Sequence, residues 1–297
     1  MTLIRRVSPM DTLQTFTTLK PRLFGIAYRM LGTRSDAEDV VQDAWLRWHE
    51  ADHTEMRSSE AWLVTVTTRL SIDRLRARKS EQEQYVGRWL PEPIVELNED
   101  TPEAAIELAS EVSIAFLWVL ERLSPDERAA FLLRQAFDLD YAEIAAIVGK
   151  SEAACRQLVS RAGERVREGR PRYTVSEQEH NELLVRFMQA ASSGDREAMK
   201  SMLSAEAELI SDGGAKMSSF AKVLQGAARV AGVFWSVEHA APGHVTYRLA
   251  RINGALGLLR YVHGVIESAN AFTIEDGRIT EVYVMRNPDK LSSVPPL

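Results

Sequence analysis

The chain has 297 residues, enough for two or three domains with separate cores, and its content of 45% hydrophobic and 26% charged residues argues against overall disorder. No run approaches the roughly 20 apolar residues of a membrane span, the N-terminus lacks a signal-peptide core, and the single Cys155 excludes an internal disulfide, so we expect a cytoplasmic protein without a membrane partner. The net charge of −6 is unevenly distributed, because two basic segments, 69–79 and 150–172, flank an acidic segment, 81–107.

The first segment, from about Asp11 to Lys79, is predicted to consist of helices joined by short turns. A capping box at Ser35–Glu38 is expected to start a helix with one acidic face, for which a solvated surface is the alternative to a binding surface. The expected buried face of this helix comprises Ala37, Val40, Val41, Ala44 and Trp48. A further helix is expected over 59–77. Its expected buried residues are Trp62, Val66 and Leu70, and its expected outward residues are Thr67, Arg69, Arg74 and Arg76.

The stretch from Ser80 to Asp100 contains Pro91, Pro93 and many acidic residues, and it has no sustained helical period. It is therefore predicted to be an extended linker whose ends are free to move. Helices are predicted to resume at Thr101 and again at Ser124, since each is followed by proline at the first helical turn.

The segment from Asp138 to Arg167 has the pattern of a helix-turn-helix. Asp140 with Glu143 is expected to cap a short helix, Gly149 to supply the turn and Ser151 to cap a second helix. The expected buried side of the second helix is Cys155, Leu158, Val159, Ala162 and Val166. Its expected outward residues are Arg156, Gln157, Ser160, Arg161 and Arg165. Arginine pairs with guanine and glutamine with adenine in the major groove, so this face predicts DNA binding; the alternative is a plain helical hairpin with a charged surface.

From about Val175 onward the pattern predicts an α+β domain. Two amphipathic helices are expected over 176–191 and 195–203. The expected strands are 244–252, 257–267, 270–274 and 279–285. The last two are expected to be joined by a hairpin turn at Asp276-Gly277.

Together these segments resemble the extracytoplasmic-function sigma factors over nearly the whole chain. Leu23–Gly32 with Asp36–Asp43 looks like the family's polymerase-binding helix, and Ala61–Arg76 looks like the helix that melts the minus-ten element. Tyr141–Ala145 with Gly149 looks like part of the minus-thirty-five reader. The resemblance implies that the chain binds the RNA polymerase core, through its β′ coiled coil and β flap, and directs it to promoter DNA.

The resemblance also implies roles for individual residues. The implied polymerase-binding residues are Asp39, Gln42 and Asp43. The implied DNA-binding residues are Arg69, Arg74, Arg76, Arg78, Arg156, Gln157, Ser160, Arg161 and Arg165. In the family the linker threads polymerase channels that hold nucleic acid, and the eight acids and one base of 81–107 suit such an electropositive channel; a solvated tether is the alternative.

The last third resembles sigma factors with a fused SnoaL-like domain, which is a cone-shaped, nuclear transport factor-like α+β fold. Three motifs carry this resemblance: Trp89–Pro93, Asn287–Leu291 and Asp212–Lys216, in which Ala215 replaces a glycine. An alanine there would strain the loop if the position needs a positive φ. The implied regulatory contacts are Trp89, Leu90, Pro91, Glu92, Pro93, Asp212, Gly213, Gly214, Lys216, Asn287, Pro288, Asp289, Lys290 and Leu291.

The resulting expectation is a multidomain protein: two all-α sigma domains, of which the second contains the helix-turn-helix, followed by the α+β domain. The expected boundaries are 8–80 and 101–173 for the two sigma domains, 81–100 for the linker, and 176–297 for the C-terminal domain. We expect this last domain to modulate initiation in cis by contacting the linker.

We expect no catalytic residue, metal or cofactor, because the histidines His239, His244 and His263 lack ligand spacing and no nucleophile–base pair is evident. A small ligand in the C-terminal domain is possible. Two alternatives stay open: a one-component helix-turn-helix regulator that binds an operator alone, and a SnoaL-type enzyme with a helical extension.

Overall fold

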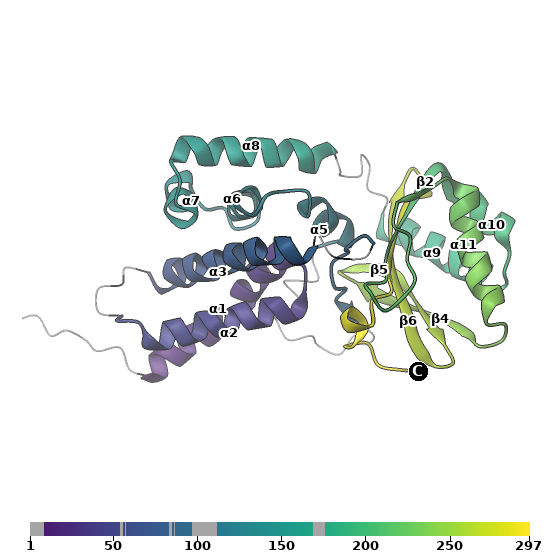
Figure 1. The fold of residues 1–297 in the computed structure, drawn as a ribbon, viewed down its shortest axis with the longest axis horizontal. Coiled ribbons are helices and arrows are strands. Elements are labelled where there is room, and N and C mark those ends of the chain that lie inside the picture. Colours follow the sequence, from purple (N-terminus) through teal and green to yellow (C-terminus); the bar gives the residue numbers. More distant parts are fainter. Residues whose placement is uncertain are drawn as a thin grey trace, which may run out of the picture. The chain divides into compact units, whose positions relative to one another are not determined.

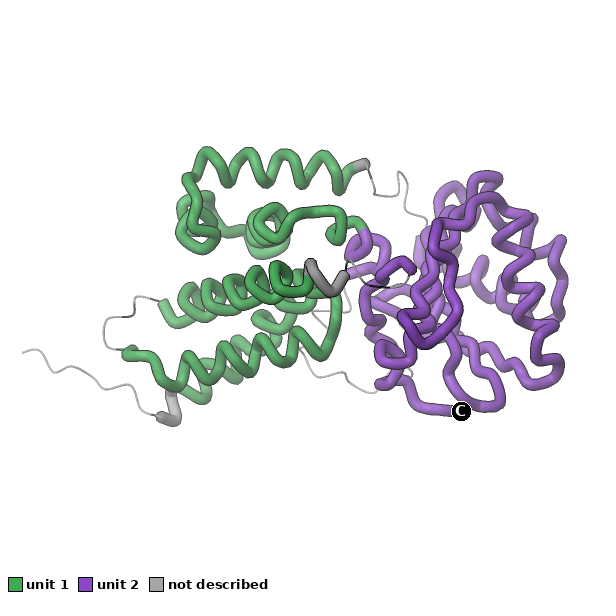
Figure 2. Tube along the Cα trace, in the orientation of Figure 1, with its two compact units in different colours: residues 1–81, 101–111, 119–168 green, residues 82–100, 112–118, 169–297 purple. Residues whose placement is uncertain are grey.

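The computed structural model describes residues 9–53, 56, 58–82, 85, 87–96, 112–168 and 176–297. The chain forms two compact units, shown in separate colours in Figure 2. Unit 1 comprises 1–81, 101–111 and 119–168, and unit 2 comprises 82–100, 112–118 and 169–297. The helix that the sequence predicts from Thr101 lies outside the described residues.

Unit 1 is helical in its described residues (Figure 1). Its helices are α1 (Pro9–Leu31), α2 (Arg34–Glu50), α3 (Ser59–Gln82), α6 (Pro125–Gln135), α7 (Tyr141–Val148) and α8 (Glu152–Glu168). Helix α5 (Ile114–Leu120) begins in unit 2 and ends in unit 1. The first helical segment and the helix-turn-helix segment pack against each other within this unit, through α1 and α6.

Helix α2 buries the five residues that its sequence pattern predicts, but it begins earlier than expected. Its N-cap is Thr33, and the capping box predicted at Ser35–Glu38 is wrong. The Thr33 hydroxyl donates instead to the Asp36 carboxylate at 2.6 Å. This contact turns Asp36 toward the helix start and leaves the rest of the acidic face exposed.

The expected faces of α3 are partly wrong, since Arg69, Arg74 and Arg76 are exposed as predicted but the buried face consists of other residues. Thr67 is fully buried, whereas Trp62, Val66 and Leu70 are half-buried. The buried face of α3 comprises Leu63, Val64, Thr67, Thr68, Ser71, Ile72 and Leu75. Hydroxyl residues can enter a helix interface because they bond to the backbone one turn earlier, as Ser71 does to the Thr67 carbonyl at 2.8 Å.

The helix-turn-helix forms as predicted. Asp140 and Glu143 make a capping box at the start of α7, and Gly149 ends that helix in the left-handed conformation with φ 71°. Ser151 accepts a hydrogen bond from the Ala154 amide at the start of α8. The five residues predicted for the inner side of α8 are all buried, and the five predicted for its outer side are all exposed.

Unit 2 is built on a seven-stranded mixed sheet with the order β1-β4-β5-β6-β7-β2-β3. Its strands are β1 (Val95–Glu96), β2 (Leu203–Asp212), β3 (Leu224–Gln225), β4 (Val245–Ile252), β5 (Ala255–Val262), β6 (Val265–Glu275) and β7 (Arg278–Met285). Among these pairs, β2 with β7 is parallel and the others are antiparallel. With its helices, this sheet confirms the predicted α+β fold that follows the helical segments.

The two faces of this sheet are covered by different parts of the chain. Helices α9 (Glu177–Ser192), α10 (Arg196–Met202) and α11 (Ala227–Ala240) pack on one face, where Phe187 and Phe234 meet edge to face. The opposite face packs against Leu90 of the linker, Ile114 of α5 and Leu291 of the 3₁₀ helix η1 (Pro288–Leu291). The described part of the linker is therefore part of the core of unit 2.

Two expectations for this part of the chain are wrong. The stretch 257–267 is not one strand, because a hairpin turn at His263 and Gly264, both with positive φ, separates β5 from β6. The linker is not free at its described end, because Leu90 is fully buried and β1 pairs with β4 through Val95 and Ile252. The hairpin turn predicted at Asp276-Gly277 is present, with φ of 48° and 70°.

Candidate functional site

The outer face of α2 presents Asp39, Gln42 and Asp43, all exposed. Asp36, at the start of the same helix, is tied to α3 by Arg74 and Arg78, each 2.7 Å from its carboxylate. Burial raises the pKa of Asp36, but the Thr33 hydrogen bond and the charges of the two arginines outweigh it, so the pKa lies below its usual value. Asp39, which is predicted for polymerase, lies 3.1 Å from Arg74, which is predicted for DNA, so the two predicted sets are neighbours on α2 and α3.

The other two arginines predicted on α3 contact α7 of the helix-turn-helix and α6, which precedes it. Arg69 donates to the carbonyl oxygens of Ala146 at 2.8 Å and Ile147 at 3.0 Å, at the C-terminal end of α7. Arg76 pairs with Asp126 of α6 at 2.8 Å. The Arg69 contacts use the unpaired carbonyls and negative end of α7, where a guanidinium is favoured.

The outward face of α8 carries the second set of predicted DNA-binding residues. Arg156 pairs with Glu152 of its own helix at 2.9 Å, and Arg165 pairs with Glu127 of α6 at 2.9 Å. Arg161 lies 3.6 Å from the same Glu127. About half of each arginine side chain is exposed. The Arg156–Glu152 pair is weak because Glu152 is also 48% exposed, whereas Glu127 is only 8% exposed and its pairs are less screened by water.

The linker meets the C-terminal domain at the Asp212 carboxylate, which is fully buried. One of its oxygens accepts hydrogen bonds from the Leu90 amide at 2.8 Å and the Lys290 ammonium at 2.7 Å. Its other oxygen accepts from the Tyr85 hydroxyl at 2.6 Å and the Gly214 amide at 3.0 Å. Burial and the nearby carboxylate raise the pKa of Tyr85, which keeps the phenol protonated as a donor.

Lys290 completes this contact from the C-terminal 3₁₀ helix. Its ammonium also donates to the Leu90 carbonyl and lies 4.0 Å from the centre of the Trp89 ring. Asn287 donates to the Tyr85 hydroxyl at 3.1 Å. We call the contacts of Tyr85, Trp89 and Leu90 with Asp212, Asn287 and Lys290 the linker seat.

A second anchor holds the linker beyond the seat. The Asn253 side chain accepts from the Ile94 amide at 3.0 Å and donates to the Val112 carbonyl at 3.0 Å. Asn253 is buried in the β4–β5 turn with φ 50°. One side chain therefore bridges the end of the linker and the segment that leads into α5.

The conformation of the loop after Asp212 explains why an alanine can stand at position 215, where the motif of the resembling sigma factors has a glycine. Gly214 has the positive φ, 58°, and Ala215 is not among the described non-glycine residues with a positive φ. A Cβ at Gly213 would lie 2.2 Å from the Met217 carbonyl oxygen, and a Cβ at Gly214 would lie 2.8 Å from the Asn287 amide nitrogen. The first two glycines are required here, and the alanine is compatible with the fold.

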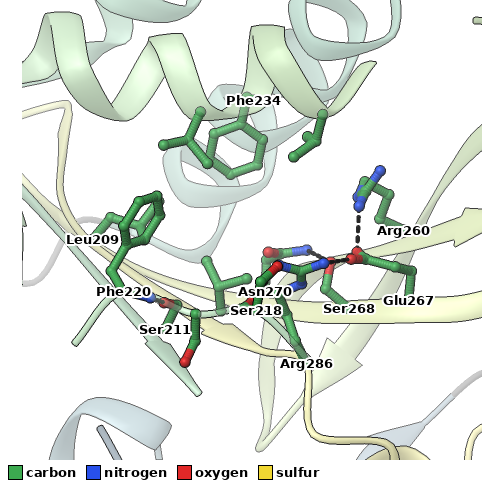
Figure 3. Close-up of a pocket in the computed structure, with 14 residues that line it drawn as sticks. Leu209, Ser211, Ser218, Phe220, Phe234, Arg260, Glu267, Ser268, Asn270 and Arg286 are labelled. Atoms are coloured by element: carbon green, nitrogen blue, oxygen red, sulfur yellow. Dashed lines mark hydrogen bonds and ion pairs between the residues drawn. The ribbon is translucent and has the colours of Figure 1, made fainter. Parts of the chain in front are cut away.

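The C-terminal domain also encloses a cavity of about 140 Å³ between α11 and the sheet. Figure 3 shows Phe234, Leu209 and Phe220 on its apolar side and the charged residues Arg260, Glu267 and Arg286 at its other end. Across the part of the chain that the structure describes, no group of three or more His, Cys, Asp or Glu side chains is placed to hold a metal ion. No helix among the described residues is long and apolar enough to cross a membrane.

Known sigma factors are similar to this chain, both in two of its helical segments and over nearly its whole length. The Sigma-70 region 2 family model matches residues 15–81, and the Sigma-70, region 4 model matches residues 114–165. The ECF RNA polymerase sigma factor SigJ of Mycobacterium tuberculosis H37Rv is 38% identical over 292 residues, covering 94% of this chain and 93% of the relative. This chain belongs to the ECF (extracytoplasmic-function) RNA polymerase sigma factors.

Two further similarities extend over the length of this sigma factor. The probable ECF RNA polymerase sigma factor SigI of Mycobacterium tuberculosis H37Rv is 31% identical over 276 residues, covering 91% of each chain. The crystal structure of Mycobacterium tuberculosis SigJ aligns with a TM-score of 0.77 and 35% identity, covering 96% of this chain and all of the other. The sigma factor thus directs RNA polymerase to initiate transcription and is not an enzyme, and both alternatives from the sequence are set aside.

The sequence did not single out three features of this sigma factor. Tyr85 and Asn253 anchor the linker, yet the sequence offers only an Asn-Gly turn signal at Asn253-Gly254. The charged end of the cavity combines Arg260 of β5, Glu267 of β6 and Arg286, which directly follows β7, and no local pattern relates them.

Proposed function

We propose that the C-terminal domain modulates transcription initiation in cis by holding the linker in its seat. The observation that carries the proposal is the Asp212 carboxylate, which is buried and shared by Leu90, Lys290 and Tyr85. A buried carboxylate is stable only with such partners. Release of the linker would break the Leu90 and Tyr85 hydrogen bonds to Asp212 and the contacts of Lys290 with Leu90 and Trp89, so the seat favours one arrangement of the linker.

The seat would compete with the polymerase for the linker. The resemblance implies that the linker enters channels of the polymerase, and Leu90 cannot be both in the core of unit 2 and in such a channel. Anything that weakens the seat should therefore alter how the sigma factor engages the core enzyme. This competition would give a role to each of the three motifs, Trp89–Pro93, Asp212–Lys216 and Asn287–Leu291.

Core-dependent transcription in vitro tests this regulation. The whole chain is compared with a chain that ends at Tyr173 and with Asp212→Asn, which removes the buried charge and keeps the shape of the side chain. The matched control is Glu197→Gln, because Glu197 is exposed and its ion pair with Lys200 lies at the surface of the same domain, outside the three motifs. We expect Asp212→Asn to shift promoter output toward that of the truncated chain; equal output from all four proteins would refute the proposal.

We further propose that Asp39, Gln42 and Asp43 form the polymerase contact. Their exposure on α2 and their negative charge support this, since exposed charges steer association and set specificity. Asp39→Lys with Asp43→Lys should weaken binding to core polymerase. Glu50→Lys, at the exposed end of the same helix, is the control; an equal loss from the control would reject this assignment.

For promoter DNA we propose two surfaces. On α8, Gln157 and Arg161 face outward and are expected to contact bases, each good contact contributing about 1–3 kcal/mol of discrimination. On α3, Arg69, Arg74, Arg76 and Arg78 would exchange their present carboxylate and carbonyl partners for the DNA strand. Gln157→Ala should change base preference at one position of the minus-thirty-five element, measured with a promoter library and core polymerase; an unchanged preference would remove Gln157 from the surface.

The expected domain boundaries, 8–80, 81–100, 101–173 and 176–297, are part of the same proposal. The contact of the helix-turn-helix domain with the β flap of the polymerase also belongs to it. Both rest on the resemblance described above.

A further inference from the structure

The cavity of the C-terminal domain has the size and lining of a site for a small aromatic molecule. Its volume is about 140 Å³. A cavity of about 150 Å³ is large enough to hold benzene. Phe220 and Phe234 lie on its apolar side with Leu209, and aromatic rings favour edge and offset contacts with another ring.

The other end of the cavity has an excess of positive charge. Glu267 pairs with both Arg260 and Arg286, so two cations face one carboxylate. The side chains of Arg260 and Glu267 are 7% and 12% exposed, and that of Arg286 is 21% exposed. The Nε atom of Arg286 is buried and has no hydrogen-bond partner among the described residues. An anionic oxygen at this end would offset the excess charge and satisfy a buried donor.

We propose that this cavity binds a small aromatic monocarboxylate, with its ring beside Phe234 and its carboxylate at Arg286, and that binding alters the linker seat. The binding step stands on the cavity alone. The coupling step rests on the proposed function, because it assumes that the linker seat is regulatory.

The loop 213–220 connects the cavity to the linker. Ser218, Ser219 and Phe220 line the cavity, and Arg286 donates to the Ser218 carbonyl at 2.6 Å. On the linker side, Gly87 lies so close to this loop that a Cβ there would be 2.8 Å from the Ser219 hydroxyl. The Arg286 amide also donates to the Asp212 carbonyl at 2.7 Å. A ligand carboxylate that draws the Arg286 side chain toward itself moves the group that holds the Ser218 carbonyl, and so disturbs the loop against which the linker packs.

Calorimetric titration of the whole chain with benzoate tests the binding step. We expect one saturable site. The neutral benzamide should bind about tenfold or more weakly, because its uncharged oxygen makes a weaker hydrogen bond to a guanidinium than a carboxylate does. Val233→Phe, which fills the cavity from α11 at a half-buried position, should also weaken benzoate binding about tenfold or more. Absence of saturable benzoate binding, equal affinity for benzamide, or unchanged affinity in Val233→Phe would overturn the site.

Hydrogen exchange of 87–96 with and without benzoate tests the coupling step. We expect faster exchange when benzoate is bound, and no change in Val233→Phe. Specific binding with unchanged exchange would overturn the coupling and leave the site standing. The proposed function fails by a different result, namely unchanged transcription after Asp212→Asn, so the two failures are distinguishable.

Discussion

The linker seat of unit 2 and the contact between α3 and region 4 in unit 1 are both made by charged side chains, but they differ in exposure to water. In the seat, Asp212 is fully buried and the Lys290 side chain is 8% exposed. In the other contact, Arg76 is 56% exposed, and Arg69 also reaches the surface. Similar ion pairs and hydrogen bonds are therefore expected to stabilise the two contacts by very different amounts.

This difference follows from solvation. An exposed ion pair gains little, because water and salt screen it. A buried pair is costly to form, but removal of one partner leaves an uncompensated charge, so the pair is hard to break. The linker seat should accordingly be either fully formed or fully broken. Separation of region 4 from α3 should cost little free energy when DNA or the polymerase competes for Arg69 and Arg76.

The largest expected effect comes from Lys290→Met, which leaves Asp212 buried without its cation. We expect the linker seat to lose roughly 3–5 kcal/mol. Hydrogen exchange of 87–96 measures this loss locally and does not require two-state unfolding of the whole chain. Lys216→Met, which removes a lysine that is 59% exposed and pairs with Asp289, should cost less than about 1 kcal/mol. Equal losses from the two variants would show that burial does not set the strength of the seat.

A smaller effect is expected from Gly213→Ala in the loop under the linker. Its Cβ would lie 2.2 Å from the Met217 carbonyl oxygen, so the backbone must move. Overpacking of this kind costs about 1–3 kcal/mol. The control is Ala215→Gly, which relieves no strain at this position and should change stability by less than about 1 kcal/mol. Thermal unfolding followed in unit 2 compares them, and a larger loss from Ala215→Gly would contradict this account of the loop.

Arg69→Gln should have a weaker effect, because its contacts with α7 are partly exposed. We expect a loss of about 1 kcal/mol in the protection of 141–148. Hydrogen exchange of α7 measures it. Arg34→Gln, which removes an exposed pair within α2, should leave α7 unchanged. If Arg69→Gln also leaves α7 unchanged, the contact between α3 and region 4 does not depend on this arginine.

The helix-turn-helix could be predicted from sequence because its signals are local. Asp140 with Glu143, Gly149 and Ser151 each act within a few residues, and all four do what their types favour. The faces of α3 could not be predicted in this way, since Thr67 and Ser71 are buried in a helix whose apolar residues suggested another side. Helix α11 was missed, because its N-cap, Gly226, supplies no side-chain hydrogen bond.

The linker seat could not be predicted from local sequence patterns, for a different reason. Asp212 and Lys290 are separated by 78 positions and Leu90 by more, so only the resemblance to sigma factors with a fused domain related their motifs. The short hairpin turn at His263-Gly264 was also missed, because a histidine with positive φ is uncommon. The sequence predicts most helices and strands of the site, but the packing that joins them depends on contacts between residues far apart in the chain.

The smallest expected effect is on the pH dependence of the α2–α3 contact through Asp36. Burial raises the pKa of Asp36, whereas the hydrogen bond from Thr33 and the charges of Arg78 and Arg74 lower it by more. The net shift of the pKa is therefore downward. A carboxyl whose pKa is lower in the folded state adds stability above its ordinary pKa, near 4, and loses that stability as the pH falls through the lowered value. Asp36→Asn should thus be less stable than the parent at pH 7, and the gap should narrow below about pH 4. Thermal unfolding of unit 1 across this range measures the gap, with Asp43→Asn as the exposed control on the same helix. A gap that stays constant with pH would mean that the charge of Asp36 does not hold α3.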